Sequence, residues 1–131
     1  MKNRKIRHQV LVGNVPYEIL VDAHDKDGKT FIETDSLSTQ LKVLARDLIL
    51  KQEGYDCAVF NFVMNTVGEK ASNIAGYLET TPANISQMRK GKPCSKTFWK
   101  FFRITMLSRL SESRNREIDR VISGNTDSKV A

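Results

Sequence analysis

Alternating and β-branched residues dominate the first third of the chain and predict a small antiparallel sheet. The segments with this pattern are Gln9–Val12, Pro16–Val21 and Lys29–Glu33. Turn-forming residues separate them, first Gly13-Asn14 and then the cluster from Asp25 to Gly28. We therefore expect a three-stranded meander, with Pro16 at a strand start or edge where its missing N–H does no harm.

A helical period replaces this pattern after residue 36. The apolar residues that recur on one helical face are Leu37, Leu41, Leu44 and Leu48. Ser36 precedes them as a candidate N-cap and Gly54 follows as a stop. We expect a helix over Leu37–Gln52 that covers the sheet, because three strands alone expose too much apolar surface.

Two short helices and a tight turn are expected between residues 71 and 90. In the first, Ala71–Leu78, the positions that share one face are Ile74, Ala75 and Leu78. Thr81 and Pro82 have the side chains that begin the second helix, Pro82–Lys90, and Gly91 ends it. Ile85 and Met88 then point inward. The positions left outward are Ala83, Asn84, Gln87, Arg89 and Lys90.

Further helices complete a bundle. Cys57–Val67 has an apolar face and is followed by Gly68, and Ser95 can cap a helix that reaches Leu110. The aromatic residues of that last helix are typical of a core. A helical pattern continues into the tail as a candidate dimer contact, through Leu107, Leu110, Ile118, Val121 and Ile122.

These elements predict an α+β fold, in which a small N-terminal antiparallel sheet of about three strands is covered by a helix and followed by a helical bundle. We expect a β-rich N-terminal region with its covering helix over 1–54, a helical domain over 55–122 and a flexible tail over 123–131.

The segment from Ala71 to Lys92 resembles the helix-turn-helix of the phage-repressor (XRE/Cro-like) family. The matching positions are Ala75, Thr81, Ile85, Ser86, Gly91 and Lys92. The resemblance covers roughly residues 56–110 and departs from the family in three places. Glu79 replaces the turn glycine, Met88 replaces a frequent tryptophan, and Ala71 replaces the usual glutamine at the start of the first helix.

Charge is distributed unevenly and supports the same interpretation. The net charge is +6. Residues 1–12 hold 4 basic and no acidic side chains, residues 13–81 hold 6 basic and 11 acidic, and residues 82–120 hold 10 basic and 3 acidic. Because clustered Lys and Arg bind DNA by displacing condensed counterions, the positive block that begins with the second short helix favours a nucleic-acid partner.

Composition excludes several other classes. Hydrophobic content of 40% and charged content of 27% are globular values. No apolar run approaches the roughly 20 residues that cross a bilayer, and the basic start lacks a sustained apolar core, so we expect a cytoplasmic protein without a membrane partner. Cys57 and Cys94 are expected as reduced thiols. The histidines and cysteines lack zinc spacing and the Asp25–Gly28 cluster lacks two calcium ligands, so no metal, cofactor or enzymatic activity is expected.

The expected activity is sequence-specific binding of double-stranded DNA by a homodimeric repressor, with residues 82–90 in the major groove. Gln87 is the first candidate for base contact, Asn84 the second, and Ala83 fits a thymine methyl. The candidates for phosphate contact are Thr81, Ser86, Arg89, Lys90, Lys92 and Lys96. Lys70 and Ser72 flank the position of the family's glutamine and are assigned to phosphate by the resemblance.

Three alternatives stay open at this point, and the first is a protein-interaction adaptor that uses the helix pair as a scaffold and shows little salt-dependent binding to nucleic acid. Repressor-type modules also occur in antitoxins that repress their own operons, and the N-terminal region would then bind a toxin partner or mediate dimerisation. An RNA-binding protein would use the same basic surface but would show exposed aromatic side chains.

Overall fold

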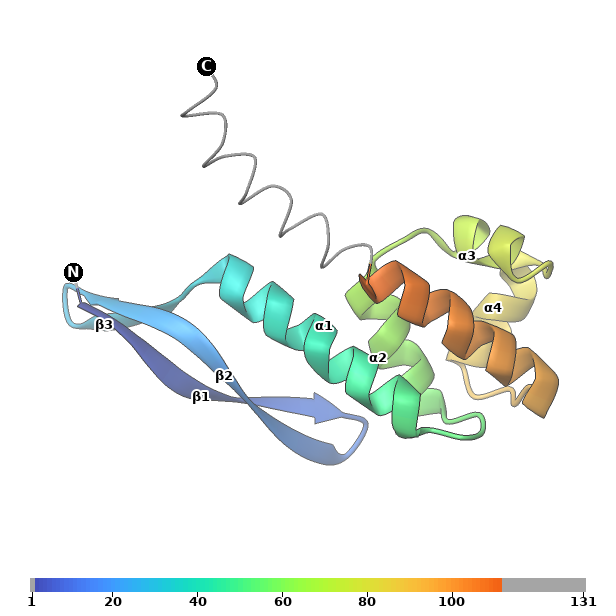
Figure 1. Ribbon diagram of the computed structural model, residues 1–131, viewed down its shortest axis with the longest axis horizontal. Helices are drawn as coiled ribbons and strands as arrows, with labels where there is room; N and C mark the ends of the chain where they lie inside the picture. Colours follow the sequence, from blue (N-terminus) through green and yellow to red (C-terminus); the bar gives the residue numbers. More distant parts are fainter. Residues whose placement is uncertain (1, 112–131) are drawn as a thin grey trace, which may run out of the picture.

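The protein is described here over residues 2–111 by a computed structural model (Figure 1). Its elements are β1 (Lys2–Val12), β2 (Val15–Lys26), β3 (Lys29–Ile32), α1 (Thr34–Lys51), α2 (Cys57–Val67), α3 (Ala71–Tyr77) and α4 (Pro82–Arg89). A fifth helix over 96–111, here called the C-terminal helix, reaches the last described residue. The expected α+β architecture, a three-stranded antiparallel sheet followed by helices, is confirmed.

The sheet is a long hairpin with one short added strand. β1 pairs with β2 along its whole length, from Lys2 opposite Asp25 to Val12 opposite Val15, and the strand order is β1-β2-β3. The turn at Gly13 has a φ of 62°, and the second turn places Asp27 and Gly28 at φ values of 54° and 75°. Both turns lie where the sequence predicts them, because few residues other than glycine, asparagine and aspartate tolerate these angles.

The first two strands are longer than the sequence predicts. β1 begins at Lys2, seven residues before the expected start at Gln9, and β2 continues beyond Val21 to Lys26. Of the side chains described in the added part of β1, Asn3, Arg4, Lys5 and Arg7 are exposed and only Ile6 is apolar, so this part has no apolar alternation to detect. Ion pairs between Arg4 and Asp25 (3.0 Å) and between Lys5 and Asp22 (3.4 Å) join the two strands there.

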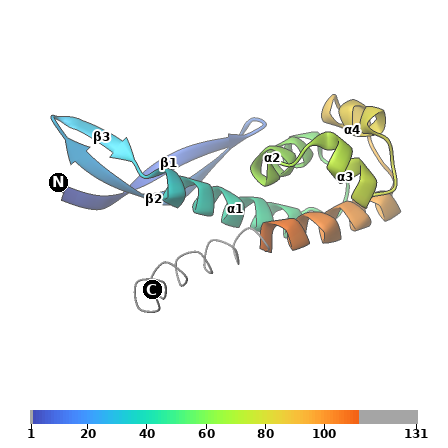
Figure 2. The same ribbon diagram turned by 90° about the horizontal axis from the view of Figure 1, so that it is seen from above.

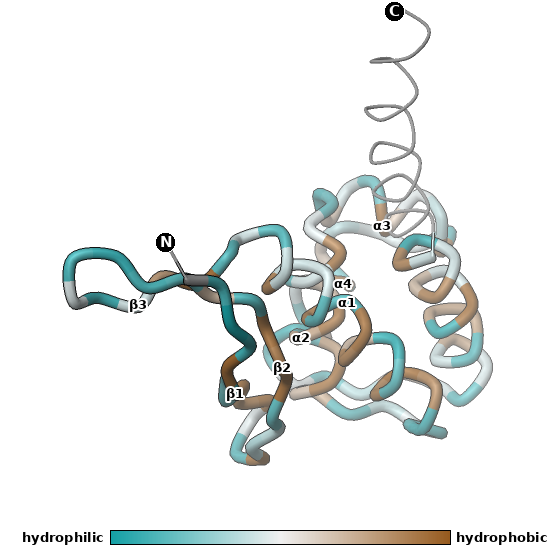
Figure 3. The backbone as a smooth tube through the Cα atoms, turned by 60° about the vertical axis from the view of Figure 1, so that its left-hand side comes forward, coloured by the Kyte–Doolittle hydropathy of each residue, from teal (hydrophilic) through white to brown (hydrophobic). Residues whose placement is uncertain are grey.

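Helix α1 packs on β2 and on α2 (Figure 1), and the first hairpin turn also reaches α2. Alternate side chains of β2 are buried, namely Ile19, Val21 and Ala23, and Figure 3 shows the hydrophobic stretch in the part of the hairpin that lies nearer the helices. On α1 the fully buried residues are Ala45 and Ile49. The four leucines expected to form its inner face are only half-buried, because α1 packs on the sheet and on other helices and has no single inner stripe.

The predicted N-cap of α1 is wrong. The helix begins at Thr34 with Glu33 as its N-cap, and no side chain caps it. The Ser36 hydroxyl instead accepts a hydrogen bond from the backbone N–H of Asp22 at 2.8 Å. Since β3 ends at Ile32 and no longer covers this edge of β2, the hydroxyl satisfies a strand donor and ties α1 to the sheet.

The C-terminal helix completes the core and closes the end of α1. Ser95 caps it as expected, accepting from the Phe98 N–H at 3.1 Å. Its Trp99 is fully buried and donates through the indole nitrogen to the Gln52 carbonyl at 2.9 Å. Arg103 donates to the carbonyls of Ile49 and Leu50. Trp99 and Arg103 together therefore satisfy carbonyls at the C-terminal end of α1.

Trp99 and Phe102 of the C-terminal helix are core, as expected, whereas Phe101 of the same helix is 59% exposed. The ring centroids of Phe60 and Phe102 are 4.7 Å apart and those of Trp99 and Phe102 are 5.2 Å apart. Leu110 is buried with them and Leu107 packs against them. The other tail positions expected in a dimer contact, Ile118, Val121 and Ile122, lie outside the described residues, as does the tail over 123–131.

Candidate nucleic-acid interface

Helices α3 and α4 are joined by a short turn that contains a strained residue. α3 ends at Tyr77 and α4 begins at Pro82. Between them Glu79 has a φ of 53°, the left-handed conformation that glycine adopts without steric cost. The Thr80 N–H then donates to the Ala75 carbonyl at 2.9 Å. The turn therefore keeps the geometry of a glycine turn with a glutamate in that place.

Local residues determine where α4 begins and which side it buries. The Thr81 hydroxyl accepts from the Asn84 N–H at 3.1 Å, and Pro82 occupies the first turn, where a donor is not needed. Ile85 and Met88 are buried at 0% and 1% exposure. Both expectations, the Thr81 cap and the inward pair, are confirmed.

The end of α4 is a Schellman motif that brings Lys92 back over the helix. Gly91 has a φ of 111°. Its N–H donates to the Met88 carbonyl at 3.1 Å, and the Lys92 N–H donates to the Gln87 carbonyl at 3.0 Å. The Lys92 ammonium then lies 3.0 Å from Gln87 Oε1 and 3.4 Å from Asn84 Oδ1. These three side chains form a connected group on α4.

Side chains in α2 and just before it anchor the last turn of α4. The Tyr55 hydroxyl donates to the Met88 carbonyl at 2.6 Å, and the Asn61 amide donates to the Arg89 carbonyl at 2.9 Å. The Cys57 thiol lies 3.5 Å from the same Arg89 carbonyl. Burial, with hydrogen bonding to Cys57, raises the pKa of Tyr55, so its hydroxyl stays a neutral donor at physiological pH.

Sequence reasoning missed these anchors. Tyr55 and Asn61 lie 33 and 28 residues before the carbonyls that they bind. No local pattern connects positions so far apart. The one signal in the sequence is Asn61 itself, because a polar side chain inside the apolar run of α2 indicates a buried hydrogen bond.

The three residues assigned to base contact differ in exposure. Ala83 and Gln87 are exposed on α4, while Asn84 is half-buried and donates from its amide to the Thr80 hydroxyl at 2.9 Å. Figure 2 shows α4 at an outer edge of the molecule, away from α1 and the C-terminal helix. The structure thus brings Ala83 and Gln87 together on one accessible surface.

Most of the residues assigned to phosphate contact are exposed. Ser86, Lys90, Lys92 and Lys96 are exposed, and Thr81 is exposed while its hydroxyl caps α4. Lys70 and Ser72 are exposed at the start of α3. A hollow of about 330 Å³ lined by Ala71 and Arg89, among others, places the start of α3 beside the end of α4.

The lysines and arginines between Pro82 and residue 111 have different surroundings. No Asp or Glu occurs from Pro82 to residue 111. Arg89 donates to the Asn65 side chain, Arg103 to carbonyls of α1, and Arg109 pairs with Glu69 at 3.3 Å and covers the Tyr77 ring at 4.0 Å. The four lysines of this stretch, Lys90, Lys92, Lys96 and Lys100, are exposed. The accessible positive charge therefore comes from ammonium groups.

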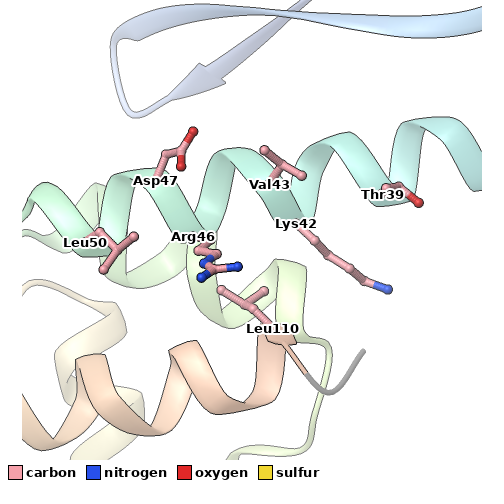
Figure 4. Close-up of a pocket in the computed structure, with 7 residues that line it drawn as sticks. All are labelled: Thr39, Lys42, Val43, Arg46, Asp47, Leu50 and Leu110. Atoms are coloured by element: carbon pink, nitrogen blue, oxygen red, sulfur yellow. The ribbon is translucent and has the colours of Figure 1, made fainter. Parts of the chain in front are cut away.

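A separate groove of about 240 Å³ runs along α1 (Figure 4). Its lining residues are Thr39, Lys42, Val43, Arg46, Asp47, Leu50 and Leu110. In Figure 4, Arg46 points toward Leu110 of the C-terminal helix, whereas Val43 and Asp47 point toward the sheet. Neither α3 nor α4 contributes to it, so it is distinct from the surface around Gln87.

Within residues 2–111, no group of three or more His, Cys, Asp or Glu side chains has the arrangement of a metal site. Cys57 and Cys94 are free and half-buried. None of the helices in the same part of the chain has the length and hydropathy needed to span a membrane. Comparison with protein families, curated proteins and solved structures finds no match for this chain.

Proposed function

We propose that this protein is a transcriptional regulator that binds double-stranded DNA sequence-specifically as a homodimer, with α4 in the major groove. The observation that carries the proposal is the outward face of α4. Ala83, Ser86, Gln87 and Lys90 are exposed on it, while Ile85 and Met88 fix the opposite face in the core. A helix held in this way presents amide, hydroxyl and methyl groups to base edges without reorganisation.

The rigidity of α4 supports the proposal. An eight-residue helix is too short to be stable alone in water. Here Thr81 caps its start, Gly91 closes its end, and Tyr55 and Asn61 hold its last carbonyls. Preorganisation of this kind lowers the entropy cost of binding and favours one register on a duplex.

Charge around α4 supports phosphate contacts. Lys90, Lys92 and Lys96 lie within seven residues of the end of α4, and no Asp or Glu follows them up to residue 111. Each phosphate neutralised on B-DNA contributes about −0.9 to the slope of log K against log salt. We expect a slope of about −2 to −3 for each protomer.

Selection of random DNA duplexes by the full-length protein, followed by sequencing, tests the proposal. The expected result is a palindromic consensus whose half-sites lie about 10 base pairs apart, as two copies of α4 related by a two-fold axis require. Retention of duplexes without any sequence preference would refute sequence-specific recognition, and a single asymmetric half-site would refute the homodimer. RNA hairpins added as competitor distinguish a duplex-DNA protein from an RNA-binding one.

A pair of matched variants connects the binding to α4. Ser86→Glu places a carboxylate on the exposed face of α4, where it repels phosphate, and should weaken binding at least tenfold. Ser108→Glu makes the same chemical change at an exposed position of the C-terminal helix and should leave binding unchanged. Equal effects of the two variants would show that α4 is not the contact surface.

A further inference from the structure

The side chains of Lys92, Gln87 and Asn84 form a hydrogen-bonded group that limits what α4 can offer to a base. The Lys92 ammonium carries only donors, so the atoms that face it at 3.0 Å and 3.4 Å must be the amide oxygens of Gln87 and Asn84. The orientation of both amides therefore follows from the identity of residue 92.

Asn84 is held at both ends of its amide. Its oxygen faces Lys92, and its nitrogen donates to the Thr80 hydroxyl at 2.9 Å. It is also half-buried. These contacts suit a side chain that positions the Lys92 ammonium above α4 and leaves base contact to its neighbours.

Gln87 is exposed and has only its oxygen turned to Lys92. Its NH₂ group stays available, and beside it lies the third ammonium hydrogen of Lys92, which neither amide oxygen accepts. The pair thus presents two donors side by side. In the major groove, guanine offers two adjacent acceptors, N7 and O6, whereas adenine offers the N7 acceptor and an N6 donor.

We propose that Lys92 is a specificity-determining residue that makes Gln87 and Lys92 together bind guanine in preference to adenine. This inference rests on the proposed function. A free glutamine would pair with adenine through one donor and one acceptor. Here an adenine amino group would meet the Lys92 ammonium, and two donors facing each other repel.

The local chain explains why Lys92 takes this position. The Schellman motif at Gly91 reverses the backbone, so that the Lys92 N–H binds the Gln87 carbonyl at 3.0 Å. Backbone and side chain of Lys92 therefore contact the same residue of α4. Lys96 is also exposed and cationic but belongs to the C-terminal helix, which makes it a matched control.

The test compares the duplexes selected by the unmodified protein, by Lys92→Met and by Lys96→Met. The unmodified protein should select guanine at one position of each half-site. Lys92→Met frees the Gln87 oxygen and should change the preference at that position toward adenine by about tenfold to a hundredfold, the range of one bidentate contact. Lys96→Met should weaken all duplexes equally and leave the consensus unchanged.

Three outcomes would overturn the inference. If Lys92→Met only weakens all duplexes to the extent that Lys96→Met does, Lys92 is a phosphate contact and the DNA-binding function stands. If the unmodified consensus has no guanine in the half-site, the assigned base is wrong. If no duplex is selected, the function and the base assignment both fail.

A measurement without DNA examines the group itself. The side-chain amide resonances of Gln87 and Asn84 in the NMR spectrum of the free protein should shift in Lys92→Met and stay in place in Lys96→Met. Unshifted amides in Lys92→Met would show that the lysine does not hold them, whatever the protein binds.

Discussion

Two glycines with the same backbone conformation but different surroundings give a sharp test of how the sheet meets the helices. Gly13 and Gly28 have φ values of 62° and 75°, both in the left-handed region. A Cβ atom added at Gly13 would lie 2.8 Å from the Cβ of Ala58 in α2. A Cβ at Gly28 would meet nothing within 4 Å. Alanine at each position therefore shares the backbone strain and differs in the steric contact.

The expected magnitudes follow from these two terms. Alanine in the left-handed region costs about 1 kcal/mol, a strain that both variants carry. At Gly13 the added methyl must also displace α2 or the turn, and overpacking of this kind costs about 1–3 kcal/mol more. We expect Gly28→Ala to lose about 1 kcal/mol of unfolding free energy and Gly13→Ala to lose about 2–4 kcal/mol.

Urea denaturation followed by tryptophan fluorescence measures both losses. Trp99 is the single tryptophan, is fully buried in the core, and reports on the helical part of the molecule. Adding Ala58→Gly to Gly13→Ala removes the Ala58 methyl with which the new Cβ clashes. The double variant should therefore be more stable than the sum of the two single changes predicts. Equal losses for the two glycine variants, with no coupling to Ala58, would refute the packing of the first hairpin turn on α2.

Three further predictions follow from the site and its surroundings. Tyr55→Phe keeps the ring but leaves the Met88 carbonyl without its donor, so it should cost about 1 kcal/mol in the same urea assay; Tyr77→Phe, at an exposed ring, serves as control and should stay within about 0.5 kcal/mol. Burial raises the pKa of the Cys94 thiol above its ordinary 9.0, so the thiolate is scarce at neutral pH. The rate of Cys94 alkylation, measured by mass spectrometry of its peptide, should therefore reach half its maximum above pH 9. A midpoint below pH 9 would contradict the burial of the thiol. Glu79→Gly relieves the strain of the left-handed backbone angle and should raise the unfolding free energy by roughly 0.5–1 kcal/mol. A loss of stability would instead mean that the glutamate side chain itself stabilises the fold.

The part of the site that could be predicted from sequence is the part that short-range chemistry determines. Thr81, Pro82 and Gly91 fix where α4 begins and ends within a dozen residues. The period of Ile85 and Met88 fixes its buried side. Each of these signals acts between residues close in sequence, so the local sequence contains all the information that defines the ends and the buried face of α4.

The parts that could not be predicted depend on distant partners. The contacts from Tyr55 and Asn61 to α4 exist only after the bundle has closed. Ser36 looked like a cap because serine serves equally well as an acceptor for a strand N–H, and only the fold decides between the two. The lysine after Gly91 suggested a phosphate contact, and its bonds to two amides depend on side-chain geometry that spacing does not specify.

The closure of α1 by the C-terminal helix has a consequence for synthesis on the ribosome. The donors of Trp99 and Arg103 reach back 47 to 54 residues to the carbonyls of Gln52, Ile49 and Leu50. While the nascent chain is shorter than about residue 103, those carbonyls have only water as partner. The hairpin and α1 therefore leave the ribosome first, but the hydrogen bonds at the C-terminal end of α1 form last. A stalled or truncated product would expose the apolar side of α1 to chaperones and proteases.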